Sequence, residues 1–226
     1  LDITPFCSLN TPNSLAVCVD NSRQDIPPIS GDFTFFGGIY RDVWLTAVSK
    51  QHFHLTNYGS EGIFISTPKV SEEKGTILIR GDIKNDATQK ALLELEHIIY
   101  HPNGSIAQSL KQSIQIKAGE QYSFRSETSP ILSPQLWTPE TPHLYRVESI
   151  LRDKKTKTVL DQSNHYTGFR WFSFDGERGF SLNGKPYKLR GICRHQDQKP
   201  IGVALTDEMH LSLIHISEPT RLLSIS

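Results

Sequence analysis

Apolar and polar residues alternate with a period of two along most of this chain, which is the pattern of half-buried β-strands. The alternation predicts strands over residues 15–19, 39–48, 63–66, 76–83, 92–100, 106–116, 122–126 and 144–151. Two turn sequences, Pro102-Asn103-Gly104 and Asn183-Gly184, suit tight hairpins. Short strands separated by turns at such intervals predict a β-sandwich.

The pattern divides the chain into segments. Residues 1–48 contain few strands and a loop rich in proline and glycine, so we expect the tail of a sandwich. Residues 49–168 hold enough strand candidates for an immunoglobulin-like sandwich, which needs about 100 residues. From 169 onward we expect a hairpin, a strand over 187–192, a polar loop and a helix that starts at Thr206. This succession is typical of the start of an α/β unit.

Charge and composition narrow the function. The chain has 226 residues, with 24 basic and 24 acidic side chains and a formal net charge of zero. Such a balance provides no field to attract nucleic acid or an anionic membrane, so we expect neither as a partner. No apolar stretch approaches the roughly 18 residues of a membrane span. Cys7, Cys18 and Cys193 are widely spaced and are expected to be unpaired, without a zinc pattern.

Four stretches carry a resemblance to a known family. They are DFTFFGGIYRDVWL (32–45), LWTPETPHLY (136–145), GFRWFSFDGERGFSLNGKPYKLRGI (168–192) and RHQDQKPIGVAL (194–205). In this order they resemble glycoside hydrolase family 2, and its β-galactosidase-like members most closely. The resemblance implies a mainly β fold: the end of a sugar-binding jelly-roll (1–48), an immunoglobulin-like β-sandwich (49–168) and the start of a truncated (β/α)₈ barrel (169–210). Residues 211–226 depart from the family, and we expect them to be a non-native tail.

The resemblance implies that the parent enzyme hydrolyses terminal non-reducing β-D-galactose residues of glycosides or oligosaccharides with retention. Another family activity, β-glucuronidase or β-mannosidase, and a non-catalytic carbohydrate-binding module are the alternatives. Retaining glycosidases need two carboxyl groups about 5 Å apart. The family carries both glutamates on later barrel strands, so no catalytic residue is expected here and this fragment should be inactive alone. Glu208, on the expected first helix, is not a candidate.

The same resemblance assigns substrate contacts. Asp32 would accept hydrogen bonds from two vicinal sugar hydroxyls, and His195 would bond another hydroxyl at the mouth of the first barrel strand. Arg194 and Asp197 would orient that loop behind His195. The alternatives are a loop aspartate that caps its own backbone and a surface histidine without a ligand.

Other implications of the resemblance concern cofactors and location. No cofactor or metal is expected within these residues, although the family is compatible with a divalent cation or sodium ion in a full-length relative. A homo-oligomeric parent is compatible with the family, and either a cytoplasmic or a periplasmic location fits.

Three further pairs of residues receive structural interpretations. We expect Arg41 and Asp42 to form a buried salt bridge, and Trp137 and Tyr145 to lie in the core. We expect His52 and His54 to lie on a solvated strand face and not to form a metal site.

Overall fold

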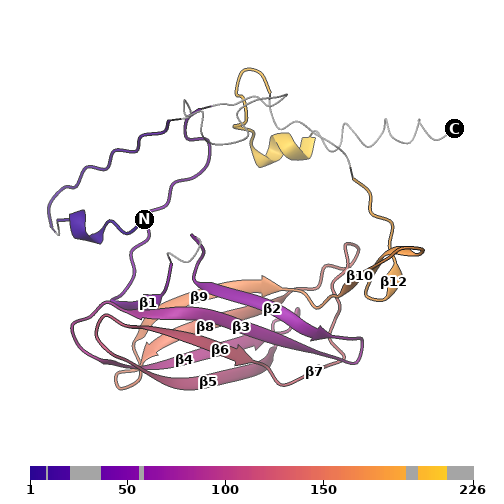
Figure 1. Cartoon of the computed structure of the whole chain (residues 1–226), viewed down its shortest axis with the longest axis horizontal. Helices are drawn as coiled ribbons and strands as arrows, with labels where there is room; N and C mark the ends of the chain where they lie inside the picture. Colours follow the sequence, from indigo (N-terminus) through magenta and orange to yellow (C-terminus); the bar gives the residue numbers. More distant parts are fainter. Residues whose placement is uncertain (9, 21–36, 56–58, 192–197, 213–226) are drawn as a thin grey trace. The chain divides into compact units, whose positions relative to one another are not determined.

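The computed structural model describes residues 1–8, 10–20, 37–55, 59–191 and 198–212. The chain divides into two compact units. The first comprises Leu1–Asp2 and Thr46–Leu189, and the second comprises Ile3–Leu45 and Arg190–Ser226. The first unit contains all the named strands (Figure 1).

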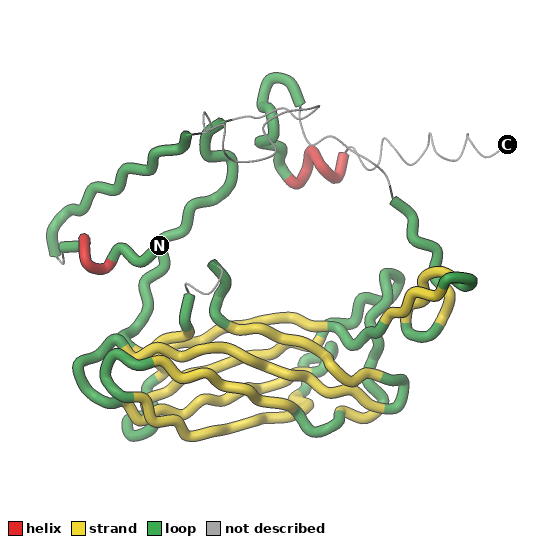
Figure 2. Tube along the Cα trace, viewed as in Figure 1, coloured by secondary structure: helices red, strands yellow, loops and turns green. Residues whose placement is uncertain are grey.

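A sandwich of two antiparallel sheets makes up most of the first unit, and Figure 2 shows its strands running side by side. In the five-stranded sheet, β3 (Lys74–Asn85) pairs with β1 (Gln51–Phe53), β2 (Ile63–Val70), β6 (Gln121–Glu127) and β7 (Ile131–Leu132). The four-stranded sheet has the order β5 (Ile106–Ile116), β4 (Ala91–Tyr100), β8 (Tyr145–Asp153) and β9 (Val159–Thr167). The sandwich predicted from the alternation is confirmed, with strand ends displaced by a few residues.

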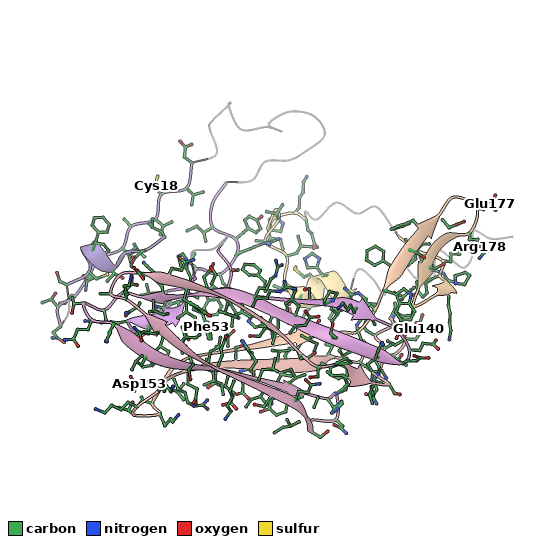
Figure 3. All side chains as sticks on the ribbon, turned by 60° about the horizontal axis from the view of Figure 1, so that its bottom comes forward. Cys18, Phe53, Glu140, Asp153, Glu177 and Arg178 are labelled. Carbon is green, nitrogen blue, oxygen red and sulfur yellow. The ribbon has the colours of Figure 1, made fainter. Side chains whose placement is uncertain are left out.

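The core lies between the two sheets because alternate residues of each strand point inward. The fully buried aliphatic side chains come from β3, β4 and β8: Ile77, Ile79, Ile83, Leu93, Leu95, Ile99, Val147 and Leu151. Phe53 fills the end of the core near β1, as labelled in Figure 3. Its backbone N–H donates to Asp161 Oδ2 at 2.8 Å, which joins the edges of the two sheets.

A small three-stranded sheet follows the sandwich within the same unit. It comprises β10 (Phe172–Asp175), β11 (Gly179–Leu182) and β12 (Lys185–Pro186). Asn183 and Gly184 form the turn between β11 and β12, with φ of 51° and 75°. Positive φ at both central residues is the geometry of a type I′ turn, so the predicted hairpin is confirmed.

Several sequence expectations fail outside the sandwich. Residues 15–19 and 39–48 form no strand, and Arg41 and Asp42 are exposed, so the prediction of a buried salt bridge is wrong. Residues 187–191 likewise form no strand. Alternation makes a strand only where a neighbouring strand continues the ladder of hydrogen bonds. Among residues 187–191 the N–H of Tyr187 donates to the carbonyl of Phe180 at 2.9 Å, and no described strand continues this pairing beyond Tyr187.

The expected helix start is present in the second unit. Residues 207–212 are helical, and the N–H of Met209 donates to Thr206 Oγ1 at 3.4 Å. Hydrogen bonding to the Thr206 side chain lowers the pKa of Glu208, which lies in the first turn. In the described portions of the chain, no helix has the length and apolar character needed to cross a membrane.

Candidate functional site

The four side chains predicted to serve the sugar site are Asp32, Arg194, His195 and Asp197. All four lie outside the described residues, so their roles stay predictions. Within the described part of the chain, no group of three histidine, cysteine, aspartate or glutamate side chains could hold a metal ion.

The first unit contains a groove of about 510 Å³ where the sandwich meets the small sheet. Its walls come from the β2–β3 turn, from the segment that precedes β8 and from the turn between β11 and β12. The lining residues are Glu72, Gln135, Leu136, Thr138, Glu140, Thr141, His143, Leu182, Asn183, Lys185, Pro186 and Tyr187. Figure 3 shows Glu140 at the end of the sandwich from which the small sheet projects.

Asn183 fixes the small sheet to the sandwich beside this groove. Its Nδ2 donates to the carbonyl of Trp137 at 3.0 Å, and its Oδ1 accepts from the N–H of Trp171 at 3.1 Å. Its own N–H donates to the Trp171 carbonyl at 2.9 Å. A side chain that is 7% exposed and bonds both segments makes the joint rigid.

Trp137 lies on the sandwich side of this joint. Its backbone N–H donates to the backbone carbonyl of Phe169 at 2.8 Å, and the guanidinium of Arg170 lies 4.5 Å from the centroid of its ring. A Cβ at Gly168 would lie 2.7 Å from Cβ of Trp137, so only glycine fits there. The expected core position is confirmed for Tyr145, which is buried against Phe169, whereas Trp137 is half-buried.

Glu140 supplies the groove with an ionised carboxylate. It belongs to a turn closed by the N–H of Thr141, which donates to Thr138 Oγ1 at 3.0 Å. Hydrogen bonds from its own backbone N–H, from the Thr138 hydroxyl and from the Tyr187 hydroxyl lower the pKa of Glu140. The Tyr187 hydroxyl lies 3.2 Å from Oε1. The carboxylate is therefore a hydrogen-bond acceptor and not a proton donor at neutral pH.

A general acid in a glycosidase needs a carboxyl group whose pKa is raised. Every described carboxyl group with a resolved shift has its pKa lowered instead. Glu96 is an example, since Lys111, Ser109 and Arg152 donate hydrogen bonds to it and outweigh its partial burial. The groove can thus bind polar groups, but the lowered pKa of Glu140 is the opposite of what an acid catalyst needs.

A second polar cluster, which the sequence interpretation missed, joins Glu61, Ser163 and His165. Ser163 Oγ lies 2.8 Å from His165 Nε2 and donates to Glu61 Oε2 at 3.1 Å. His165 Nε2 is 3.6 Å from the same carboxylate oxygen. A serine-histidine-carboxylate triad places its serine and its acid on different ring nitrogens, so this cluster is not a triad. Sequence spacing gives no signal for it, because 102 residues separate Glu61 from Ser163.

His52, on β1, and His54, directly after β1, do not form a solvated face. His52 is 8% exposed, its Nδ1 lies 2.9 Å from the Ser49 carbonyl oxygen, and its Nε2 lies 3.9 Å from Asp86 Oδ2. The expectation of solvent exposure is therefore wrong for His52. Successive side chains of a strand point to opposite faces, so His52 lies on the face away from the core residue Phe53, beside the Ser49 carbonyl and Asp86.

Comparison with known proteins gives a consistent result. The family model described as "Glycosyl hydrolases family 2" matches residues 61–170. The chain is similar to a solved β-glucuronidase of Bacteroides uniformis, with 71% identity and a TM-score of 0.90 over 96% of this chain and 26% of that one.

Curated relatives show lower identity over a similar share. A β-glucuronidase of Bacteroides fragilis is 32% identical over 92% of this chain and 30% of its own length. A β-galactosidase of Bacteroides ovatus is 30% identical over 94% of this chain and 24% of its own length. The chain thus spans about a quarter of the length of the proteins it matches.

Proposed function

We propose, because this chain belongs to glycosyl hydrolases family 2, that the protein to which it contributes is a retaining β-glycosidase that removes a terminal β-linked sugar. The observation that carries this proposal is the 71% identity to a β-glucuronidase over nearly the whole chain. Relatives described as glucuronidases and galactosidases support the same glycosidase class.

The sugar is the finer part of the proposal. The sequence alone suggested galactose, and this stays a prediction. The high identity to the Bacteroides uniformis enzyme favours a β-D-glucuronide instead, which we propose as the substrate. A β-galactoside is the second candidate, supported by the Bacteroides ovatus relative. The two sugars differ at C6, where a carboxylate replaces a hydroxymethyl group and requires cationic or N–H donors.

The chemistry divides between this chain and the rest of the protein. In a retaining mechanism one carboxylate attacks the anomeric carbon while a carboxylic acid protonates the departing oxygen, and water then hydrolyses the glycosyl-enzyme ester. We propose that both glutamates belong to barrel strands outside these residues. Asp32 and His195 would hold sugar hydroxyls, with Arg194 and Asp197 orienting the loop. Such contacts accelerate the reaction where they strengthen in the transition state.

The test compares two proteins on two substrates. The whole protein and the purified 226-residue chain are each incubated with 4-nitrophenyl β-D-glucuronide and 4-nitrophenyl β-D-galactoside. We expect turnover by the whole protein, with the higher kcat/KM for the glucuronide, and none by the chain. Turnover by the isolated chain would contradict the assignment of both glutamates, and a preference for the galactoside would restore the first expectation.

The predicted contact is tested in the whole protein. Asp32→Asn should lower kcat/KM about 10- to 100-fold, because a charged hydrogen bond to the sugar is lost. Asp86→Asn, on the sandwich beside Lys84, is the matched control and should leave kcat/KM unchanged. Equal activity of both variants would remove Asp32 from the site.

A further inference from the structure

The groove where the sandwich meets the small sheet has the size of a small-molecule site. Its volume of about 510 Å³ falls within the roughly 300–1,000 Å³ that ligand pockets occupy. All of its lining residues belong to the first unit, so this unit alone forms the groove.

One part of the lining is apolar and fixed in place. Leu136 packs against the core of the sandwich, and Leu182 on β11 is only 8% exposed. Pro186 on β12 extends this apolar surface. A rigid apolar wall with a few polar groups is the usual composition of a site for a small organic molecule.

Glu140 supplies a hydrogen-bond acceptor that is already ordered. Its turn is closed by the N–H of Thr138, which donates to the carbonyl of Thr141 at 3.1 Å, and the two threonine hydroxyl oxygens lie 2.9 Å apart. Across the groove, the hydroxyl of Tyr187 donates to Glu140 Oε1 at 3.2 Å. A carboxylate offers about four acceptor positions, and the three donors around Glu140 leave capacity for a further hydroxyl. A ligand that donates to it needs little reordering of the protein.

The charges of the lining restrict the chemistry of the ligand. Glu72 and Glu140 contribute two carboxylates, and among the described lining residues Lys185 is the one lysine or arginine. The carboxylates repel an anionic ligand and require donors from it, whereas Lys185 weakens the attraction for a cation. An uncharged molecule with several hydroxyl groups and one apolar face satisfies both parts of the lining. A neutral pyranose sugar has these properties, since its C–H face is apolar and its hydroxyl groups donate.

We propose that this groove is a carbohydrate-binding site that takes a neutral pyranose unit of a glycan. The carboxylates make it select against a hexuronate, although a glucuronide is the substrate proposed for the whole protein. The inference does not rest on the proposed glycosidase activity, because binding to this chain is measured without turnover. Failure of the glucuronide assay leaves it unaffected.

The test titrates the isotope-labelled 226-residue chain with methyl β-D-glucopyranoside and, separately, with methyl β-D-glucuronide. The amide chemical shifts of Glu140, Thr141 and Tyr187 should move saturably with the glucoside. We expect a Kd on the order of 1 mM, as the affinity per atom of a single sugar unit allows. The glucuronide should bind at least about 5-fold more weakly, since Glu72 and Glu140 repel its carboxylate.

Two variants locate the binding. Glu140→Gln should weaken binding of the glucoside about 5- to 10-fold, because a charge-assisted hydrogen bond is lost, and should narrow the gap between the two sugars. Glu177→Gln is the matched control, because it removes the same charge from an exposed turn of the small sheet outside the lining. Figure 3 labels both glutamates. The control should leave the Kd of both sugars unchanged.

The amide signals of β3 and β4 report whether each variant is folded, since these strands carry the core. With those signals undisturbed, equal affinity of the two variants for the glucoside would overturn the proposal. Tighter binding of the glucuronide than of the glucoside, or no saturable shift at concentrations well above the expected Kd, would also overturn it. Saturable shifts confined to residues outside the lining would assign the sugar to another surface and reject this site.

Discussion

The sandwich and the small sheet are built from the same alternation of apolar and polar residues, yet only in the sandwich are most of the apolar side chains buried. In the sandwich the inward residues of β3 and β4 meet a facing sheet, and Ile79 and Leu95 are both fully buried. In the small sheet the aromatic residues of β10 face away from any described cover, and Phe174 is 73% exposed. Periodicity thus fixes which residues share a face, whereas burial depends on whether the chain supplies an opposing layer.

The two regions therefore differ in whether the chain itself covers their apolar side chains. The sandwich satisfies its apolar face within about 120 residues, close to the size at which an immunoglobulin-like domain is complete. The small sheet is held by polar contacts at Asn183 and leaves its apolar face available. The first region should therefore govern the stability of this chain, and the second should govern its association with further structure.

The largest effect is expected from a core truncation. Leu95→Ala on β4 should lower the free energy of unfolding by about 2–5 kcal/mol, because it removes a fully buried side chain and leaves a cavity. Phe174→Ala, a larger truncation on β10, should change it by no more than about 0.5 kcal/mol in the same chain. Urea unfolding followed by tryptophan fluorescence measures both. Similar losses for the two variants would abolish the distinction between the regions.

A second effect depends on pH and belongs to the sandwich alone. His97 on β4 is 1% exposed, its Nδ1 lies 2.8 Å from Ser149 Oγ, and its Nε2 has no hydrogen-bond partner. Burial lowers the pKa of His97 from 6.5 to about 4. Between these values the unfolded chain binds more protons than the folded chain, so stability falls as pH falls from 6.5 towards 4. The corresponding loss is on the order of 3 kcal/mol.

The measurement is urea unfolding of the wild type and of His97→Gln at pH 7 and at pH 4.5. Glutamine does not titrate here, so the variant should lose less stability than the wild type between the two pH values. Carboxyl groups with lowered pKa values, such as Glu96, change the stability of both proteins with pH by the same amount. Their contribution therefore cancels when the two pH dependences are compared. An identical pH dependence for the two proteins would show that His97 is not held neutral.

The sequence predicted the parts of the fold that depend on local pattern. Strands such as β5 were located closely, and the turn at Asn183-Gly184 followed from its residue types. Residues 39–48 failed because alternation does not reveal whether a partner strand exists. The contact of Ser163 with Glu61 was equally hidden, since it brings together residues 102 positions apart across the edges of two sheets. Asp32 and His195, which came from family resemblance, lie outside the described residues and remain predictions.

The joint between the two regions gives a third, smaller effect. Asn183→Ala should lower the free energy of unfolding by about 2 kcal/mol, because the Trp137 carbonyl and the Trp171 N–H both lose a buried partner. Asn103→Ala, in the exposed hairpin turn before β5, removes only local bonds to Ser105 and should cost about 0.5 kcal/mol or less. Hydrogen exchange of β10 and β11 should rise in the first variant and not in the second. Unchanged exchange in Asn183→Ala would mean that other contacts hold the small sheet.

The smallest effect concerns the close approach behind Trp137. Gly168→Ala places a methyl group 2.7 Å from Cβ of Trp137, so the indole must shift and its contact with Arg170 weakens. We expect a loss of about 1–2 kcal/mol in urea unfolding, together with a change in tryptophan emission. Gly176→Ala is the matched control, because nothing lies within 4 Å of the Cβ that it would add at the tip of the small sheet. Since glycine to alanine also restricts the unfolded chain, the control should be neutral or slightly stabilising. If both variants behave alike, the close approach of residue 168 to Trp137 does not help to join the sandwich to the small sheet. The hydrogen bonds of Asn183 and the bond from Tyr187 to Glu140 would then account for the joint.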